Sequence, residues 1–208
     1  MSFFKPLKAV SRCMPDMPIS IYNAGINMKP QKGAKVLAKH LKPYFNKHWD
    51  GFHGYNYIPP DKYSGRPALV QSGNIFHFSF EIFNEYYEHA YLAYKTLVKN
   101  CIDKVYPEPL VVVENIPSFG RVSLTSKKDV IIIHVLVYCP EMRGKMEVIE
   151  EPIKLRDVIL KVRFDKVESV YLAPSRHKLD FAQQGNYTTI KIPEIIGYQM
   201  IAIQTRVG

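Results

Sequence analysis

Two closely spaced prolines, Pro107 and Pro109, divide the sequence into stretches of different periodicity. Before them, apolar residues recur with the 3.6-residue period of a helix; after them, short apolar runs alternate with turn residues. Because proline cannot continue a helix, the joint marks a change of architecture. We therefore predict two domains, residues 1–107 and residues 108–208.

The stretch before the prolines is predicted to form one amphipathic helix of about five turns. Its apolar stripe is Tyr87, Ala90, Tyr91, Tyr94, Leu97, Val98, Cys101, Ile102 and Val105. Upstream, Ala68–Gln71 and Ile75–Phe80 flank the turn-forming Ser72-Gly-Asn, which predicts a β-hairpin.

The N-terminal part contains two further predicted elements. Residues 18–22 (PISIY) favour a short strand. Residues 33–43 are predicted to be helical, with Val36, Leu37, His40 and Leu41 on one face and lysines opposite. Residues 1–50 carry nine basic and two acidic side chains, so this lysine face could meet phosphate or an acidic partner. A solvated helix face explains it more simply, and we expect no nucleic-acid binding.

After the joint, the turn spacing predicts an antiparallel β-sandwich. The predicted strands are Leu110–Glu114, Gly120–Thr125, Val130–Tyr138, Val158–Val162, Ser169–Ala173, Thr188–Ile192 and Tyr198–Thr205. Residues 130–138 (VIIIHVLVY) are so continuously apolar that we expect this strand to lie inside a sheet and to be buried on both faces.

Composition sets broad limits on what the protein can be. With 47% hydrophobic and 23% charged residues, it is typical of a globular chain. No apolar run approaches the roughly 20 residues that cross a bilayer, and no secretory signal is apparent, so we expect a cytoplasmic protein without membrane contact. Cys13, Cys101 and Cys139 have no pairing pattern, and the last two are interpreted as small buried hydrophobes.

No pattern typical of a catalytic centre is found. Glu81, Glu85 and Glu88 are explained as acidic residues near a helix start, and the pair Glu85 and His89 as a surface contact. Glu147, Glu150 and Glu151 resemble a solvated turn. His48, Asp50 and His53 have ligand chemistry, but they lack a metal-site spacing, so we predict no metal or other cofactor.

Residues 44–67 lose all periodicity and are rich in aromatic residues, glycine and proline, which predicts a long loop. Aromatic rings there could stack on sugars, while short polar groups bind hydroxyls. Packing against a neighbouring domain or subunit is the other explanation, and the one we favour. The carbohydrate or interface candidates are Tyr44, Phe45, His48, Trp49, Asp50, His53, Tyr55 and Arg66.

Five segments, in this order, resemble the C-terminal region of bacterial β-galactosidase-like glycoside hydrolases. They are MPISIY, KVLAKHLKPYFNKHWDGFHGYNYIPP, PALVQSGNIFHFSFEIF, LVKNCIDKVYPEPLV and YLAPSRHKLDF…IPEIIGYQMIAIQ. The resemblance implies a TIM barrel upstream, the end of an amidotransferase-like trimerisation domain up to about residue 107, and then a complete β-sandwich. The implied fold class is α+β: a partial parallel α/β layer followed by an antiparallel sandwich.

The resemblance also implies that no family catalytic residue lies in this chain. We therefore expect a non-catalytic C-terminal portion of a glycoside-hydrolase-like protein, acting in assembly and in shaping a sugar site. Its expected partners are a second copy or an upstream TIM-barrel chain, and a carbohydrate. The alternative is a free-standing carbohydrate-binding module that uses the aromatic loop 44–67.

Overall fold

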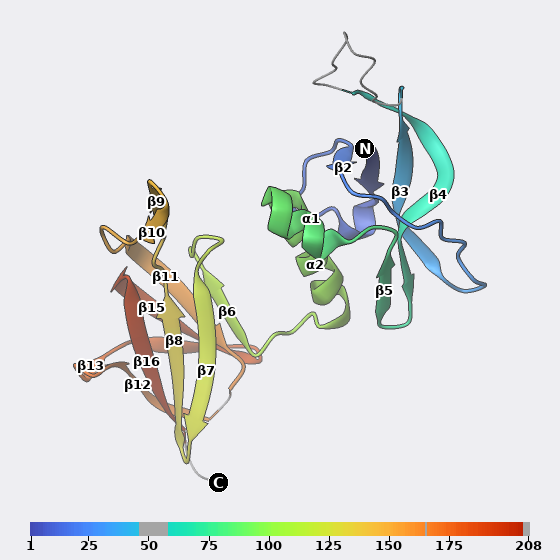
Figure 1. The fold of residues 1–208 in the computed structure, drawn as a ribbon. Coiled ribbons are helices and arrows are strands. Elements are labelled where there is room, and N and C mark those ends of the chain that lie inside the picture. The colour runs from blue at the N-terminus through green and yellow to red at the C-terminus, as the bar shows by residue number, and fades with distance from the viewer. Residues whose placement is uncertain (46–57, 165, 206–208) are drawn as a thin grey trace. The chain divides into compact units, whose positions relative to one another are not determined.

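The structure, a computed structural model, describes residues 1–45, 58–164 and 166–205. The chain divides into two compact units, Met1–Glu108 and Pro109–Gly208 (Figure 1). Each unit has its own hydrophobic core. No helix in the described ranges is long and apolar enough to span a membrane.

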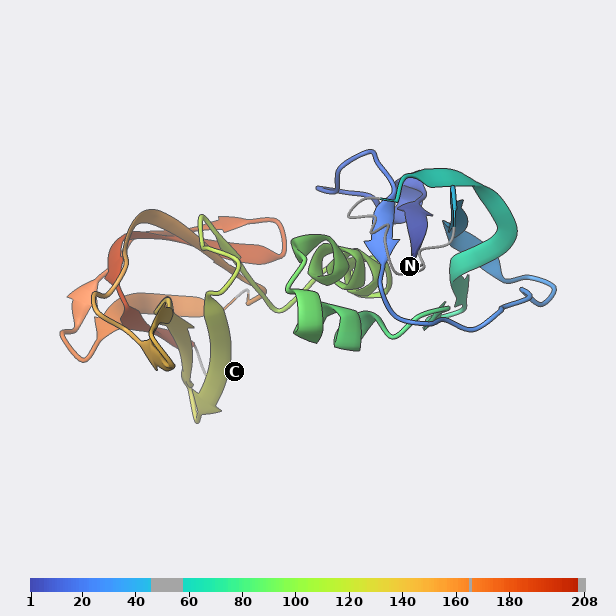
Figure 2. The ribbon, with the colours of Figure 1, turned by 45° about the horizontal axis from the view of Figure 1, so that its top comes forward.

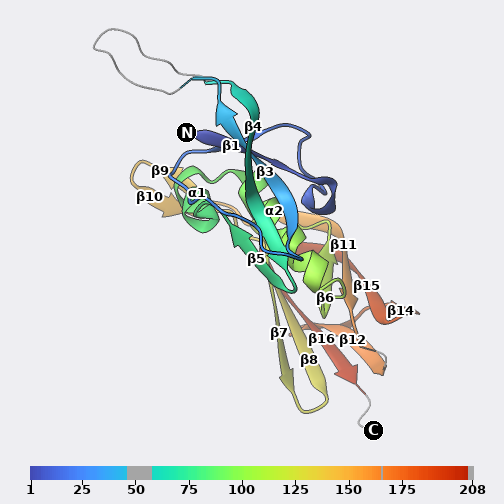
Figure 3. The same cartoon turned by 90° about the vertical axis from the view of Figure 1, so that its right-hand side faces the viewer.

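The first unit is built on a five-stranded sheet with the order β2-β1-β3-β4-β5. The strands are β1 (Ser2–Pro6), β2 (Ile19–Ile21), β3 (Lys35–Pro43), β4 (Pro60–Ser72) and β5 (Ile75–Phe78). Figure 3 shows β3 and β4 as long neighbouring strands. Every pairing of strands in the described part of this unit is antiparallel. The partial parallel α/β layer expected from the sequence is therefore not what these residues form.

Residues 33–43 are the main error of the sequence prediction, because they form strand β3 instead of a helix. β3 pairs with β1 on one side and β4 on the other. Leu37 and Ala38 are buried there, and Lys39 and Lys42 are exposed. Pairing on both edges satisfies the backbone of β3, and this tertiary context overrides a local helical pattern. The expected helical lysine face does not exist.

The strand predicted at residues 18–22 and the hairpin after residue 68 are confirmed as β2 and the β4–β5 hairpin. The predicted loop 44–67 is shorter than expected, because β4 begins at Pro60. Within it, residues 46–57 lie outside the described part of the chain.

Two helices replace the single long helix predicted before Pro107. They are α1 (Ile82–His89) and α2 (Leu92–Val105), and a one-turn 3₁₀ helix, η1 (Lys8–Val10), precedes β2. Figure 2 shows α1 and α2 on the same side of the strands. The break lies at Ala90, whose φ of 48° is left-handed and ends α1. Phe4, Phe80 and Tyr94 meet in the core, where the Phe4 and Phe80 rings stack 5.2 Å apart.

The second unit is a sandwich of two antiparallel sheets with the orders β14-β15-β11-β6 and β13-β12-β16-β8-β7. The first sheet contains β6 (Val111–Glu114), β11 (Lys154–Val162), β14 (Phe181–Gln184) and β15 (Tyr187–Ile196). The second contains β7 (Arg121–Lys127), β8 (Val130–Leu136), β12 (Val167–Ala173), β13 (His177–Lys178) and β16 (Tyr198–Thr205). A separate hairpin joins β9 (Glu141–Arg143) and β10 (Met146–Val148).

All seven strands predicted in this unit are found, and four further strands of two to four residues, β9, β10, β13 and β14, were not predicted. The interior position of β8 between β7 and β16 is also confirmed. Its burial on both faces is wrong. Ile131, Ile133 and Val135 are buried in the core, whereas the alternate residues are only partly buried or exposed.

Candidate functional site

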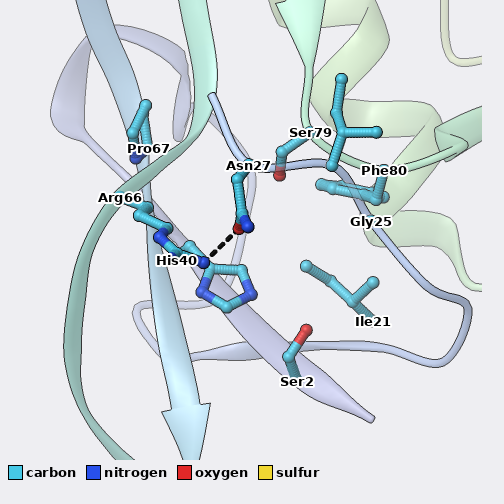
Figure 4. Close-up of a pocket in the computed structure, with 10 residues that line it drawn as sticks. Ser2, Ile21, Gly25, Asn27, His40, Arg66, Pro67, Ser79 and Phe80 are labelled. Carbon is cyan, nitrogen blue, oxygen red and sulfur yellow. Dashed lines mark hydrogen bonds between the residues drawn. The ribbon is translucent and has the colours of Figure 1, made fainter. Parts of the chain in front are cut away.

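A cavity of about 60 Å³ in the first unit combines charged and polar side chains (Figure 4). The groups that give it chemical character are Ser2, Asn27, His40, Arg66 and Ser79, with Phe80 as an apolar wall. They come from β1, from the connection between β2 and β3, and from β3, β4 and the end of β5. The cavity is thus assembled by the sheet and not by one local motif.

A bulge in β4 carries one of these polar groups, Arg66, and lies opposite β3. Lys39 pairs with Pro67 and Leu41 with Tyr63, so β4 advances four residues where β3 advances two. The extra residues include Gly65, whose φ of +82° favours glycine. Bulges re-aim side chains next to functional sites, and this one lies opposite His40.

The bulge also creates a small hydrogen-bond network. The Oγ of Ser64 lies 3.0 Å from Nδ1 of His40 and accepts a bond of 3.2 Å from the backbone N–H of Arg66. The guanidinium of Arg66 donates to the side-chain oxygen of Asn27. Four side chains from β3, β4 and the β2–β3 connection are therefore held in fixed relative positions.

The electrostatics of the cavity favour a neutral imidazole beside a permanent cation. Burial is the larger cause that lowers the pKa of His40, and the nearby Arg66 guanidinium lowers it further. An arginine carries five N–H donors and stays charged. The cavity therefore presents donors, a neutral ring and a positive charge, a set that suits hydroxyl or carboxylate oxygens.

The connection that carries Asn27 is fixed by backbone contacts. The N–H of Ile26 donates to the carbonyl oxygen of Ser79 over 2.7 Å. A Cβ on Gly25 would lie 2.5 Å from the same oxygen, so no larger residue fits without movement. This close approach places Asn27 against Arg66.

The structure places the sequence candidates unevenly. Arg66 lines the cavity. Tyr44 is 71% exposed and forms an edge-to-face contact with the half-buried Phe45, their ring centroids 6.4 Å apart. The candidates His48, Trp49, Asp50, His53 and Tyr55 lie outside the described residues. Of the eight candidates, the cavity includes Arg66 alone among those described.

The sequence prediction missed Asn27, His40, Ser2 and Ser64 as parts of a site. His40 was assigned to a helix face, and the others lie in segments without a motif. The available signal was Gly65, since an isolated glycine inside a strand indicates a bulge. It was hidden because residues 44–67 were all assigned to a loop.

Glu85 is paired with His89 as predicted, but its side of the pair is buried and not at the surface. Its side chain is fully buried, and its carboxylate accepts bonds from the backbone N–H groups of Tyr22 (2.9 Å) and Asn23 (2.6 Å). The Tyr94 hydroxyl lies 3.1 Å away, and Nε2 of His89 3.8 Å away. Burial and then Glu85 raise the pKa of Tyr94. Glu85 therefore ties α1 to the end of β2.

The other glutamates considered in the sequence, Glu81, Glu88, Glu147, Glu150 and Glu151, are exposed. Arg143 bonds to both oxygens of Glu150 at 2.8 Å and forms an ion pair with Glu141, and these contacts raise its pKa. Glu147, predicted in a turn, lies in the short strand β10. Within residues 1–45, 58–164 and 166–205, no group of three or more His, Cys, Asp or Glu side chains could hold a metal ion.

Comparison with known proteins identifies the fold. No protein-family model matches the chain, and no curated protein matches its sequence. Among solved structures, α-L-fucosidase isoenzyme 2 from Paenibacillus thiaminolyticus matches with a TM-score of 0.89 and 23% identity. The match covers 99% of this chain and 32% of the fucosidase chain. The chain therefore has the fold of about a third of a glycoside hydrolase.

A second solved structure is more distant. It is a cycloisomaltooligosaccharide glucanotransferase from Paenibacillus sp., in complex with cycloisomaltoheptaose. It matches with a TM-score of 0.37 and 12% identity over 53% of this chain and 21% of that chain. A match this weak carries no argument about fold or function.

Proposed function

We propose that the chain is a non-catalytic, C-terminal portion of a glycoside-hydrolase-like protein, which assembles with a catalytic barrel and shapes a sugar site. The observation that carries the proposal is the fold match, in which 99% of this chain corresponds to only 32% of an α-L-fucosidase chain. The catalytic barrel would be supplied by other polypeptide, on the same chain or a separate one.

An exposed apolar face on the first unit supports the assembly role. Phe83 and Tyr87, one turn apart on α1, are 73% and 87% exposed. An open hollow of about 400 Å³ lies beside Phe83 and Phe78. Large apolar side chains that gather on a surface are typical of sites where another protein docks.

The polar cavity supports the sugar-shaping role. Its volume of about 60 Å³ is far below the roughly 300–1,000 Å³ of pockets that enclose a drug-sized ligand, so it would take one substituent of a sugar and not a whole ring. The Arg66 guanidinium and the Asn27 amide would bind its oxygen atoms. The fucosidase match makes an L-fucoside the first sugar to test.

Two measurements test the proposal. The purified chain should not hydrolyse 4-nitrophenyl α-L-fucopyranoside; hydrolysis at enzyme-like rates that Glu-to-Gln changes abolish would show that it is an enzyme itself. Light scattering should show self-association of the isolated chain through its uncovered α1 face. The double change Phe83→Ser and Tyr87→Ser should reduce it, and Tyr63→Ser, a matched exposed aromatic on β4, should not.

A free-standing carbohydrate-binding module that uses loop 44–67 is the second candidate function. It is favoured by the exposed rings at the described ends of that segment, Tyr44 and Tyr63, with Nζ of Lys39 lying 5.5 Å from the Tyr63 centroid. A monomer that binds oligosaccharides saturably, seen by the fluorescence of the single tryptophan, would favour this candidate, provided that calorimetry shows the binding to be lost in Trp49→Ala.

A further inference from the structure

The outward face of the β13-β12-β16-β8-β7 sheet has an aromatic surface that the cavity and the α1 face do not involve. On β8, Ile131, Ile133 and Val135 point into the sandwich core, so His134 and Leu136 point to the opposite side. Tyr198 on β16 pairs directly with Leu136 and is 39% exposed. His134 pairs with Met200, so Tyr198 and His134 are diagonal neighbours on this outward face.

The rings of His134 and Tyr198 form one flat surface. Their planes are within 15° of parallel and their centroids are 6.1 Å apart. Nδ1 of His134 and the hydroxyl of Tyr198 share a hydrogen bond of 2.6 Å. Because a hydroxyl lies in the plane of its own ring, a bond this short between near-parallel rings joins them edge to edge and not face to face.

A third ring belongs to the same region. Tyr138 follows β8 and lies against Gly197, where an added Cβ would come within 2.5 Å of the tyrosine ring. Gly197 is buried and immediately precedes Tyr198. The missing side chain at position 197 therefore lets the Tyr138 ring approach the backbone next to the edge-to-edge pair.

The groups beside the ring pair are polar and mostly uncharged. Ser123 on β7 pairs with His134, and the Thr125 hydroxyl lies 3.3 Å from Nε2 of His134. Both residues are exposed. Arg121 is the charged neighbour, through its pairing with Leu136. Flat rings bordered by hydroxyls match a ligand with one apolar face and many hydroxyl groups at its rim. Since most neighbouring groups are uncharged, we expect this ligand to be neutral.

We propose that this face, defined by His134, Tyr198, Ser123 and Thr125, binds a neutral oligosaccharide. The C–H face of a pyranose ring stacks on the edge-to-edge pair, and the hydroxyls of β7 bond to the sugar's hydroxyls. The site extends the sugar contact of the protein to the second unit. It does not depend on assembly through α1, so the two ideas can fail separately.

The test is a calorimetric titration of the full chain with four neutral probes: 2′-fucosyllactose, cellotetraose, maltotetraose and xylotetraose. At least one should bind, and Tyr198→Ala should weaken that binding about tenfold, because one stacking ring is lost. Tyr198→Phe keeps the ring and loses the bond to His134, so its effect should be smaller. Phe181→Ala removes a ring of equal exposure (38%) on β14 of the other sheet and should leave the affinity unchanged.

Three outcomes overturn the proposal. One is that no probe binds the full chain. Another is that Tyr198→Ala, shown to be folded by far-UV circular dichroism, binds as tightly as the unchanged protein. The third is binding that Tyr44→Ala weakens and Tyr198→Ala does not, which would assign the sugar to the first unit.

Discussion

The two units of this chain are held together in different ways. The core of the second unit is made almost entirely of alternating Ile, Val and Leu from its two facing sheets. The first unit also has an apolar core, but long-range polar contacts cross it. Of the buried polar side chains in the described residues, Ser79, Glu85 and Asn100 belong to the first unit and Thr188 alone to the second.

These polar contacts link segments far apart in the sequence. The Asn100 amide donates to the carbonyls of Val10 and Arg12 at 2.8 Å, and the Tyr94 hydroxyl donates to Ser20 at 2.7 Å. Glu85 accepts from the amides that follow β2. Buried polar networks of this kind specify one arrangement of a core, whereas periodic apolar strands specify mainly which face is buried.

The largest expected effect is the destabilisation of the second unit, whose core is apolar. Leu160 is fully buried in the core of the second unit, so Leu160→Ala should lower its free energy of unfolding by about 4 kcal/mol. The first unit should stay folded, because the cluster around Leu160 contains only residues of the second unit.

Cys101 provides the measurement that separates the two units. It is buried in the first core, and burial raises the pKa of its thiol to about 11, so it should react slowly with a thiol reagent until that core opens. The experiment uses a background with Cys13→Ser and Cys139→Ser, so that Cys101 is the one thiol left. For the Leu160→Ala variant, circular dichroism should show easier denaturation of the second unit, while the rate of Cys101 labelling should stay the same. Faster labelling would mean that the two cores unfold together.

A somewhat smaller loss of stability is expected when a buried polar contact of the first unit is removed. Glu85→Ala leaves the backbone N–H groups of Tyr22 and Asn23 without their acceptor, at a cost of about 3 kcal/mol. Cys101 labelling should accelerate accordingly. Glu85→Gln keeps one carbonyl acceptor and should cost less, and Glu81→Ala, exposed just before α1, should change little. Equal labelling rates in the Glu85 and Glu81 variants would contradict this role.

The smallest expected effect concerns pH. Because the pKa of His40 is lowered in the folded state, the unfolded chain binds the proton more readily once the pH falls below about 6.5. The first unit should therefore lose stability as the pH falls through that value toward the folded-state pKa, and His40→Gln should remove this part of the loss.

Arg66→Ala should raise the pKa of His40 only partway to its usual value, because burial, the larger cause, remains. An NMR titration of the His40 ring measures the shift. Arg176→Ala removes an arginine from the second unit and serves as the control, with no expected change. A full return to the usual pKa would show that charge, not burial, dominates.

The comparison explains how much the sequence could predict. In the second unit, apolar runs and turn residues predicted seven of the strands and the interior place of β8. In the first, residues 33–43 have apolar spacing compatible with a helix, and only pairing with β1 and β4, distant in sequence, makes them a strand. The break at Ala90 was also invisible, because the apolar period continues through it.

The candidate site was predicted only through Arg66. His40 and Asn27 reach that arginine because a β4 bulge and a close contact at Gly25 bring three segments together. Neither the bulge nor the close contact can be predicted from the spacing of residues in the sequence. On the second unit, Tyr198 and His134 are 64 residues apart and meet only through the register of β8 and β16.

The way in which main-chain atoms hold the β2–β3 connection has a consequence for how this protein can diversify. On one side of the cavity, the N–H of Ile26 donates to the carbonyl oxygen of Ser79, and Gly25 packs against the same oxygen. Just before them, the N–H of Asn23 donates to the carboxylate of Glu85. The backbone shape of this side of the polar cavity is therefore set independently of the side chains of Asn27, His40 and Arg66. If the cavity binds an oxygen-bearing group as proposed, exchanges at positions 27, 40 and 66 would change which group it accepts while the backbone that shapes the cavity stays the same.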